Sequence, residues 1–547
     1  MNRRQFFKTA VVAGVAAIGP ASATPAVTAP LPNWPPSNRK HLIKPFELEE
    51  VSIAHLQSAM TAGSLTAVLI TRKYLARIKE IDRRGPKLNS VIELNPDALA
   101  IAAALDNERK ARGPRGPLHG IPVLIKDNID THDRLKTTAG SLALMDSLPP
   151  RDSTVAERLR AAGAVLLGKT NLSEWANIRS SHSTSGWSGR GGLTLNPYAL
   201  DRNPSGSSSG SAAAVSANLC VVAVGTETDG SITAPSSYNG LVGIKPTVGL
   251  VSRAGIIPIA HSQDTAGPMA RTVRDAAILL GCLAAGQDPR DPATTNSRAA
   301  ADYTVFLAPH GLRGARLGVA RKFFGILDEV DRLMEDAIAE MKRQGAIIVD
   351  PADLPTHGQF GGDAETDVLL YEFKSDLNNY LAGLGPSAPV RSLKEIIEFN
   401  EKNKAREMPF FGQDLFLKAE AKGPLTEKSY LDALAGNQRL TREEGIDAVM
   451  AKHELDAIIA PTTGPAQLTD LLWGDRDTGG CTTPAALAGY PHLTVPAGHV
   501  MGLPVGLSFF GRAWSEGKLL QLAFAYEQAT QARKPPQFLP RIPIAAS

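Results

Sequence analysis

Two hydrophobic patterns alternate along most of the chain. Short apolar runs bounded by turn residues predict buried β-strands, and the clearest are residues 88–94, 121–125, 164–169, 219–224, 315–320, 346–349, 455–461, 492–496 and 505–510. Between these runs, apolar residues recur at helical spacing and predict packed helices, for example at residues 96–112, 155–162, 271–285, 329–344 and 518–532. An alternation of helices with short apolar strands is typical of an α/β layered fold.

Residues 355–440 interrupt this pattern. They are more charged than their surroundings, more helical in spacing and poor in apolar strands, which is typical of an inserted helical cap or a helical surface subregion. Because strand signals of the same kind lie on both sides of this segment, we expect one large domain over residues 46–535 with the insertion inside it. The 547 residues provide ample length for such a core, although length alone would also allow several domains.

The N-terminus has the features of an export signal. Arg3 and Arg4 precede two phenylalanines, an apolar run follows at residues 9–18, and residues 21–23 (Ala-Ser-Ala) form a small-residue cleavage site. The apolar run is too short to span a bilayer. The arrangement resembles a twin-arginine signal, so we expect export by the twin-arginine (Tat) machinery, cleavage after Ala23 and a periplasmic or secreted protein. An uncleaved surface helix is the alternative.

Composition limits the partners of the mature protein. Residues 24–45 are rich in proline and predict a loose leader, and residues 536–547 predict a C-terminal tail. No segment after the signal approaches transmembrane length, so we expect no membrane contact once the signal is removed. The formal net charge of +3 gives no reason to expect nucleic acid as a partner. The oligomeric state stays open.

The chain lacks the common spacings of metal and phosphate sites. Cys220, Cys282 and Cys481 lie far apart and form neither a metal-binding spacing nor a disulfide framework. Cys220 lies in an apolar run, which predicts a buried, inert thiol. Neither an H-E-x-x-H pattern nor a G-x-x-x-x-G-K-[ST] loop occurs. We therefore expect no metal and no cofactor.

Serine and glycine gather in two clusters, residues 205–211 and 225–231. A helix pattern rich in alanine and an apolar strand pattern lie between them, which could bring the two clusters close together in space. Glycine lets backbone amides approach a ligand, and a serine among such amides suits a nucleophile with an oxyanion hole. Because both residue types dominate ordinary turns, two flexible surface loops are the alternative.

Lys126 comes directly after the apolar run at residues 121–125. If its side chain follows that run into the interior, the charged form is disfavoured and the pKa falls, which makes Lys126 a candidate base. A lysine at a strand end that reaches water is the alternative. Residues 206–210 also match the G-x-S-x-G nucleophile elbow, with Ser208 as the nucleophile. Such an elbow should follow a strand, however, and Pro204 lies there instead.

Lys126 and the two serine clusters together resemble the motifs of the amidase signature family. Residues 118–127 (LHGIPVLIKD) are similar to its lysine motif, residues 206–211 (GSSSGS) to its GGSSGGS loop and residues 225–231 (GTETDGS) to its GTDTGGS loop. Residues 168–171 and 243–247 fit flanking motifs, and the resemblance covers essentially all of residues 46–535. It implies a single large α/β domain with a mixed central β-sheet covered by helices on both faces.

The resemblance also implies a Ser–Ser–Lys triad that needs no cofactor. Ser231 would be the acylating nucleophile. Ser207, whose peptide bond is cis in the family, would relay the proton, and Lys126, held neutral, would accept it.

Substrate-binding groups follow from the same resemblance. Backbone amides around Thr228, Asp229, Gly230 and the nucleophile itself would form the oxyanion hole, and Ala176 falls near a substrate-contact position. Asp229 stands where the family pattern usually has glycine, and Glu227 where it has aspartate. The side chain at position 229 could therefore shape substrate choice or point away from the site.

These departures, with residues 171–177 (NLSEWAN), look most like the bacterial peptide-amidase branch, whose members remove ammonia from C-terminal peptide amides. We therefore expect an exported amidase that hydrolyses linear carboxamides of small molecules or short peptides through a Ser231 acyl-enzyme. An aryl-acylamidase or esterase of the same family and a non-catalytic exported binding protein are the alternatives. A component of an amidotransferase is disfavoured, because charged transfer RNA is cytoplasmic. For Asp127, His119 and His261 we expect structural roles.

Overall fold

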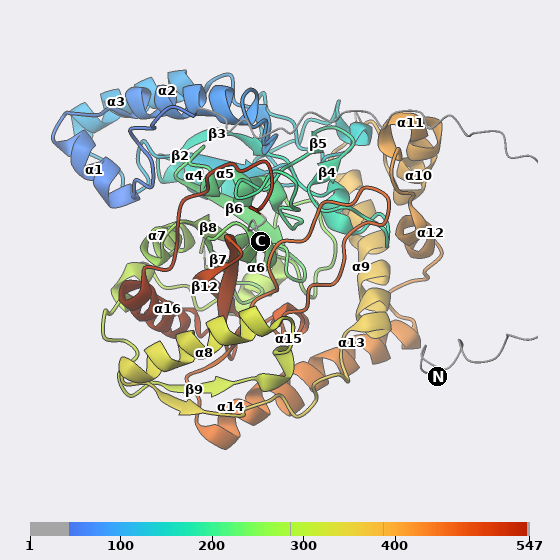
Figure 1. The fold of residues 1–547 in the computed structure, drawn as a ribbon. Helices are drawn as coiled ribbons and strands as arrows, with labels where there is room; N and C mark the ends of the chain where they lie inside the picture. Colours follow the sequence, from blue (N-terminus) through green and yellow to red (C-terminus); the bar gives the residue numbers. More distant parts are fainter. Residues whose placement is uncertain (1–42, 285, 387, 544–547) are drawn as a thin grey trace, which may run out of the picture. The chain divides into compact units, whose positions relative to one another are not determined.

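The structure is a computed structural model that describes residues 43–284, 286–386 and 388–543 (Figure 1). The expected export signal, residues 1–23, lies outside the described residues, as do most of the expected leader and the last four residues of the expected tail. Among the described helices, none is both long enough and apolar enough to cross a membrane.

Within the described residues, eleven strands form one mixed β-sheet, in the order β1-β3-β2-β6-β8-β7-β12-β13-β11-β9-β10. They are β1 (Val91–Leu94), β2 (Pro122–Lys126), β3 (Val165–Thr170), β6 (Val222–Glu227), β7 (Val242–Lys245), β8 (Thr265–Ala270), β9 (Arg316–Val319), β10 (Ile347–Val349), β11 (Ala457–Pro461), β12 (His492–Val500) and β13 (Leu503–Phe510). β2 is parallel to both β3 and β6, whereas β7, β8, β12 and β13 pair antiparallel with their neighbours. A separate hairpin joins β4 (Trp187–Ser188) and β5 (Gly192–Leu193).

The predicted strands are present within a few residues, and the sheet also contains β7 and β8. β8 has the sequence TAGPMA, and its Gly267 has no room for a side chain, because a Cβ atom there would lie 2.0 Å from the carbonyl oxygen of Ile244. The glycine and proline that allow close packing at this position also interrupt the apolar run by which a strand is recognised. β6 begins at Val222, later than the run that starts at Leu219, and continues through Glu227.

Helices pack against both sides of this sheet, which confirms the predicted fold class. Outside the insertion they are α1 (Ile53–Thr61), α2 (Ala67–Arg77), α3 (Ala98–Arg112), α4 (Thr154–Ala161), α5 (Ser209–Ser216), α6 (Thr233–Tyr238), α7 (Val273–Leu283), α8 (Asp328–Arg343), α14 (Asp447–His453), α15 (Thr482–Ala488) and α16 (Glu516–Thr530). Figure 1 shows α7 and α16 on one side of the central strands and α6 and α15 on the other. All side chains of β2, β3 and β6 are buried between these layers.

The segment between β10 and α14 is mainly helical. It forms α9 (Gly362–Gly383), α10 (Leu393–Lys402), α11 (Lys404–Glu407), α12 (Asp414–Glu420) and α13 (Lys428–Thr441), and Figure 1 shows α9 to α12 gathered beside the β4–β5 hairpin. These helices have a core in which Phe373, Leu377 and Phe416 pack with Trp175 and Ile259 from loops near the sheet. The insertion therefore covers loops rather than strands.

The described part of the C-terminal tail packs on the domain. Phe538 is buried and its N–H donates to the carbonyl oxygen of Pro197, while the N–H of Leu200 donates to the carbonyl oxygen of Leu539. Residues near 538 thus belong to the folded domain, beyond the boundary expected at residue 535.

Candidate active site

The two serine clusters lie side by side, as their spacing predicted. The N–H of Ser208 donates to the carbonyl oxygen of Ser231 over 3.2 Å. The Ser208 hydroxyl donates to the Thr226 carbonyl oxygen at 3.0 Å and accepts from the Thr226 N–H at 3.2 Å. Ser208 is fully buried, so its hydroxyl joins the loop before α5 to the end of β6. This position does not suit the nucleophile of a G-x-S-x-G elbow.

Lys126 follows its strand into the interior. β2 and β6 are parallel neighbours, so Lys126 at the end of β2 lies near Thr226 at the end of β6. Its Nζ atom lies 2.8 Å from Ser207 Oγ, 2.9 Å from Thr226 Oγ1 and 3.2 Å from the Thr226 carbonyl oxygen. Burial lowers the pKa of Lys126 to about 7, although the negative charges of Asp264 and Glu227 oppose this shift. The alternative of a lysine that reaches water is therefore wrong.

Ser207 is held between the lysine and neighbouring backbone. It is fully buried, the Gly206–Ser207 peptide bond is cis, and the Ser207 carbonyl oxygen accepts from the N–H of Ser173 at 3.1 Å. Only glycine fits at position 206, because a Cβ atom there would lie 2.2 Å from Ser173 Oγ. These contacts leave the Ser207 hydroxyl beside Lys126 Nζ.

The loop of Ser231 presents backbone donors. Among the described residues, no acceptor receives a hydrogen bond from the N–H groups of Asp229, Gly230 or Ser231. Gly230 has a φ of +74°, a conformation that favours glycine. The buried carboxylate of Glu227 accepts from the N–H groups of Ile232 at 2.7 Å and Thr233 at 2.9 Å and so holds the end of the loop. Three adjacent unpaired donors can stabilise an oxyanion.

A cavity of about 210 Å³ is lined in part by Thr226, the residue that contacts Lys126 Nζ. Ala176 and Thr228 line it together with Asn128 and an apolar wall that includes Ile257 and Ile259. Asn128 donates to Thr226 Oγ1 at 3.1 Å, while its buried Oδ1 atom has no donor in the described part of the chain. The Thr228 hydroxyl donates to Asp264 at 2.6 Å. The cavity thus offers both apolar surface and hydrogen-bonding groups.

Ala176 reaches this cavity through an unusual backbone. Trp175, Ala176 and Asn177 have φ angles of +51°, +54° and +76°, in the left-handed region that non-glycine residues rarely adopt. Such conformations often occur near functional sites. A second opening of about 240 Å³ is lined by Gly206, Asp229 and Gly230, among others.

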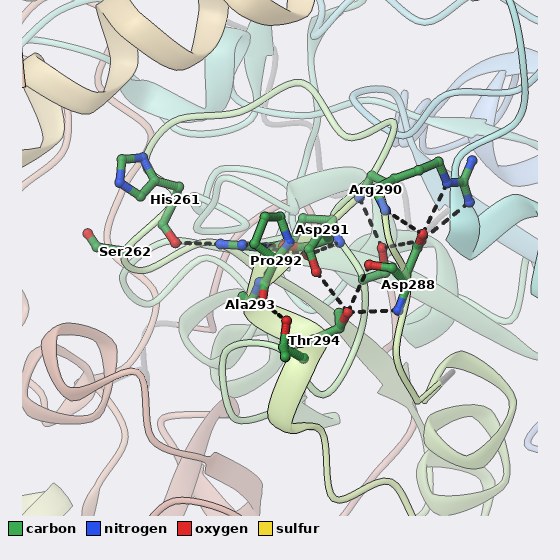
Figure 2. Close-up of polar contacts among 12 residues, drawn as sticks. His261, Ser262, Asp288, Arg290, Asp291, Pro292, Ala293 and Thr294 are labelled. Carbon is green, nitrogen blue, oxygen red and sulfur yellow. Dashed lines mark hydrogen bonds and ion pairs between the residues drawn. The ribbon is translucent and has the colours of Figure 1, made fainter.

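Several of the side chains that line the Thr226 cavity form ion pairs, and Figure 2 shows part of this network. Arg253 pairs with Asp291 at 2.6 Å and donates to the carbonyl oxygen of His261. The His261 ring lies 2.8 Å from Asp376 and 3.5 Å from Glu372 on α9. The hydrogen bond to Asp376 raises the pKa of His261. The side chains of His261, Glu372 and Asp376 lie close enough together to offer ligands to a metal. Both ring nitrogens of His261 face carboxylates, however, so the three residues form an ion pair between the loop of His261 and α9.

The structure brings together Lys126, Ser207 and the Ser231 loop, as expected, and it shows positioning roles that the sequence did not predict. Asp127 pairs with Arg190 at 3.0 Å, and His119 Nε2 lies 2.9 Å from the Leu105 carbonyl oxygen, so both have structural roles. Cys220 is buried, and burial raises the pKa of its thiol to about 12. The sequence did not predict positioning roles for Thr226, Ser208 and Glu227. Each of these residues acts through a hydrogen bond to a residue distant in the sequence or to a backbone group, and a local pattern does not reveal such a bond.

Similarity to known amidases extends over most of the chain. The family described as Amidase matches residues 69–520. A probable amidase of Arabidopsis thaliana is 44% identical over 504 residues, covering 90% of this chain and 93% of that protein. A putative amidase of Schizosaccharomyces pombe is 38% identical over 519 residues, covering 90% of this chain and 87% of that protein. The X-ray structure of native peptide amidase from Stenotrophomonas maltophilia is 52% identical, with a TM-score of 0.85, and covers 90% of this chain and 100% of that chain.

Proposed function

We propose that this chain, which belongs to the amidase family and hydrolyses amide C–N bonds, acts on C-terminal peptide amides through an acyl-enzyme on Ser231. The observation that carries the proposed chemistry is the 2.8 Å contact between the buried Lys126 Nζ and Ser207 Oγ, beside the loop of Ser231. The similarity to a peptide amidase supports the substrate class.

Proton transfer follows from the hydrogen bonds of Lys126. A neutral amine has two N–H groups and one lone pair, and Thr226 offers two acceptors within 3.2 Å. With both N–H groups on Thr226, the lone pair of Nζ faces the hydroxyl of Ser207. As Ser231 Oγ attacks the amide carbonyl, Ser207 takes the proton of Ser231 and passes its own to Lys126.

The N–H groups of residues 229–231 then stabilise the oxyanion of the tetrahedral intermediate. When the C–N bond breaks, the proton returns through Ser207 to the leaving nitrogen, and ammonia departs. Water then attacks the acyl-enzyme and gives its proton through Ser207 to Lys126. When the second tetrahedral intermediate collapses, the proton returns through Ser207 to Ser231 Oγ, which releases the carboxylic acid and restores Ser231.

We also propose that the protein acts outside the cytoplasm. The paired Arg3 and Arg4, the short apolar run and the small residues before Thr24 support export by the twin-arginine machinery. A fusion of residues 1–40 to a reporter tests this, with Arg3→Lys/Arg4→Lys as the control. Equal export of both fusions would contradict a twin-arginine route.

Ammonia release from a small panel tests the proposed chemistry and substrate. The panel holds a C-terminally amidated dipeptide, a fatty acid amide, an aryl acylanilide followed by its amine, and a p-nitrophenyl ester. We expect the amidated dipeptide to have the highest kcat/KM and Ser231→Ala to release no ammonia. Turnover of only the ester or the anilide would keep the acyl-enzyme and discard the peptide amide. No turnover and no labelling by a serine-reactive probe would favour a binding protein.

A further inference from the structure

The side chain of Asp229 points away from its loop toward two helices. Thr483 on α15 donates to Asp229 Oδ2 at 2.7 Å. The other oxygen, Oδ1, is buried and has no hydrogen-bond partner counted among the described residues. The carboxyl of Glu365, in the first turn of α9, interacts with the carboxyl of Asp229. Two carboxyl groups can form a hydrogen bond only when one of them carries a proton.

Glu365 contacts the same loop by a second route. Its Oε1 atom accepts from Gln263 Nε2 at 3.2 Å, and the same Gln263 nitrogen donates to the Thr228 carbonyl oxygen at 3.4 Å. Glu365 is therefore linked both to Asp229 and, through Gln263, to Thr228. These two residues precede the serine of the loop, so α9 contacts the chain beside the N–H groups of residues 229–231.

The surroundings favour a single shared proton. Burial is the main cause that raises the pKa of both carboxyls, and the charge of Asp229 raises that of Glu365 further, to about 8. Lys245 and the hydroxyls of Thr482 and Thr483 favour the charged form of Asp229. The charge of Asp229 also contributes to raising the pKa of the Glu227 carboxyl. With a pKa of about 8, Glu365 is the group of the pair that keeps a proton at neutral pH.

We propose that Glu365 is a positioning residue, which holds the loop of residues 228–231 in its reactive geometry by sharing a proton with Asp229. This inference rests on the proposed function, since it concerns the same oxyanion-binding amides. It also connects two features of the sequence: aspartate replaces the usual glycine at position 229, and α9 supplies a carboxyl that can pair with it. Loss of the shared proton places two charges side by side, and their repulsion displaces the loop.

Variants of Glu365 test this through the alkaline side of the pH–rate profile for an amidated dipeptide. Glu365→Gln retains a donor to Asp229 but has no proton to lose. We expect its kcat near pH 7 to stay close to that of the wild type, while the fall in kcat above about pH 8 disappears. Glu365→Ala leaves Asp229 without this partner, and we expect kcat to fall between about 10- and 100-fold with little change in KM. Asp363→Asn is the matched control, because Asp363 is exposed in the same first turn of α9.

Each outcome separates this inference from the proposed function. If Glu365→Gln has the wild-type alkaline limb and Glu365→Ala the wild-type kcat, the positioning role is wrong while amide hydrolysis stands. If Glu365→Ala fails to fold, the profile of Glu365→Gln decides alone. A wild-type protein that releases no ammonia from any amide overturns the proposed function itself. If Asp363→Asn loses as much kcat as Glu365→Ala, the loss comes from removing any negative charge in the first turn of α9, and the inference is wrong.

Discussion

Lys126 Nζ lies 2.8 Å from Ser207 Oγ, and both side chains are completely buried. A lysine in this position acts as a base only in its neutral form, and burial lowers its pKa to about 7. The contact therefore makes the protonation state of one side chain the main determinant of activity near neutral pH.

We expect kcat/KM for an amidated dipeptide to rise with pH through about 7, because deprotonation of Lys126 creates the base. Lys126→Ala should lower kcat by roughly 10²- to 10⁴-fold, the usual contribution of a general base. Lys169→Met is a control, since Lys169 is equally buried but contacts Thr137 and a backbone carbonyl. An acid limb that persists unchanged in active Lys126→Ala would contradict the assignment.

The same pKa shift predicts a gain in stability on replacing Lys126. The folded-state pKa of about 7 lies below the ordinary value of 10.5, so between these two pH values the unfolded chain binds more protons than the folded chain. Lys126 therefore costs stability at pH 7, and this cost diminishes as pH rises toward 10.5. Lys126→Met should melt at a higher temperature than the wild type at pH 7, with a smaller difference at pH 9. A lower melting temperature at pH 7 would show that the hydrogen bonds of Lys126 outweigh its desolvation.

Ser207 and Ser208 are adjacent but should respond differently to substitution. Ser208 Oγ makes two hydrogen bonds with the backbone of Thr226 in the interior, and leaving these groups unpaired costs about 1–3 kcal/mol. Ser208→Ala should therefore lower the melting temperature yet still release ammonia. Ser207→Ala should keep the melting temperature and lose most of its kcat. Loss of all probe labelling in folded Ser208→Ala, with labelling retained in Ser231→Ala, would instead assign the nucleophile to Ser208.

The sequence predicts the parts of this molecule that depend on local pattern. Apolar runs mark β2, β3 and β11, and the order of three motifs is enough to place Lys126, Ser207 and Ser231 and to predict the family to which the chain belongs. The family motifs, rather than periodicity, decide between the open interpretations of the serine clusters, since Ser and Gly patterns also fit ordinary turns.

What the sequence does not predict depends on contacts between distant segments. The link of Glu365 to Asp229 joins an insertion to a catalytic loop, and neither residue alone indicates the other. Similarly, Lys169 and Lys245 lie near the ends of β3 and β7 and are as buried as Lys126. Only the structure shows that their Nζ atoms reach backbone carbonyls rather than a serine. Burial of a lysine is thus insufficient to identify a base.

A buried charge cluster should hold the helical insertion to the sheet-side loops. Arg179 lies 3.0 Å from Glu174, donates to the Glu407 carbonyl oxygen at the end of α11, and lies over the rings of Trp187 and Phe411. Removing one partner of such a pair leaves an uncompensated charge and costs about 3–5 kcal/mol. We therefore expect Arg179→Met to lower the melting temperature strongly at pH 8.

The loss should be smaller at pH 5, because burial raises the pKa of Glu174 and its carboxyl can then take up a proton in place of its lost partner. Thermal melts of Arg179→Met at both pH values, beside Arg179→Met/Glu174→Gln, measure this directly. The double variant should regain much of the lost stability at pH 8, since the uncompensated carboxylate is gone. Equal melting temperatures of Arg179→Met and the wild type at pH 8 would show that the cluster contributes little to holding the insertion in place.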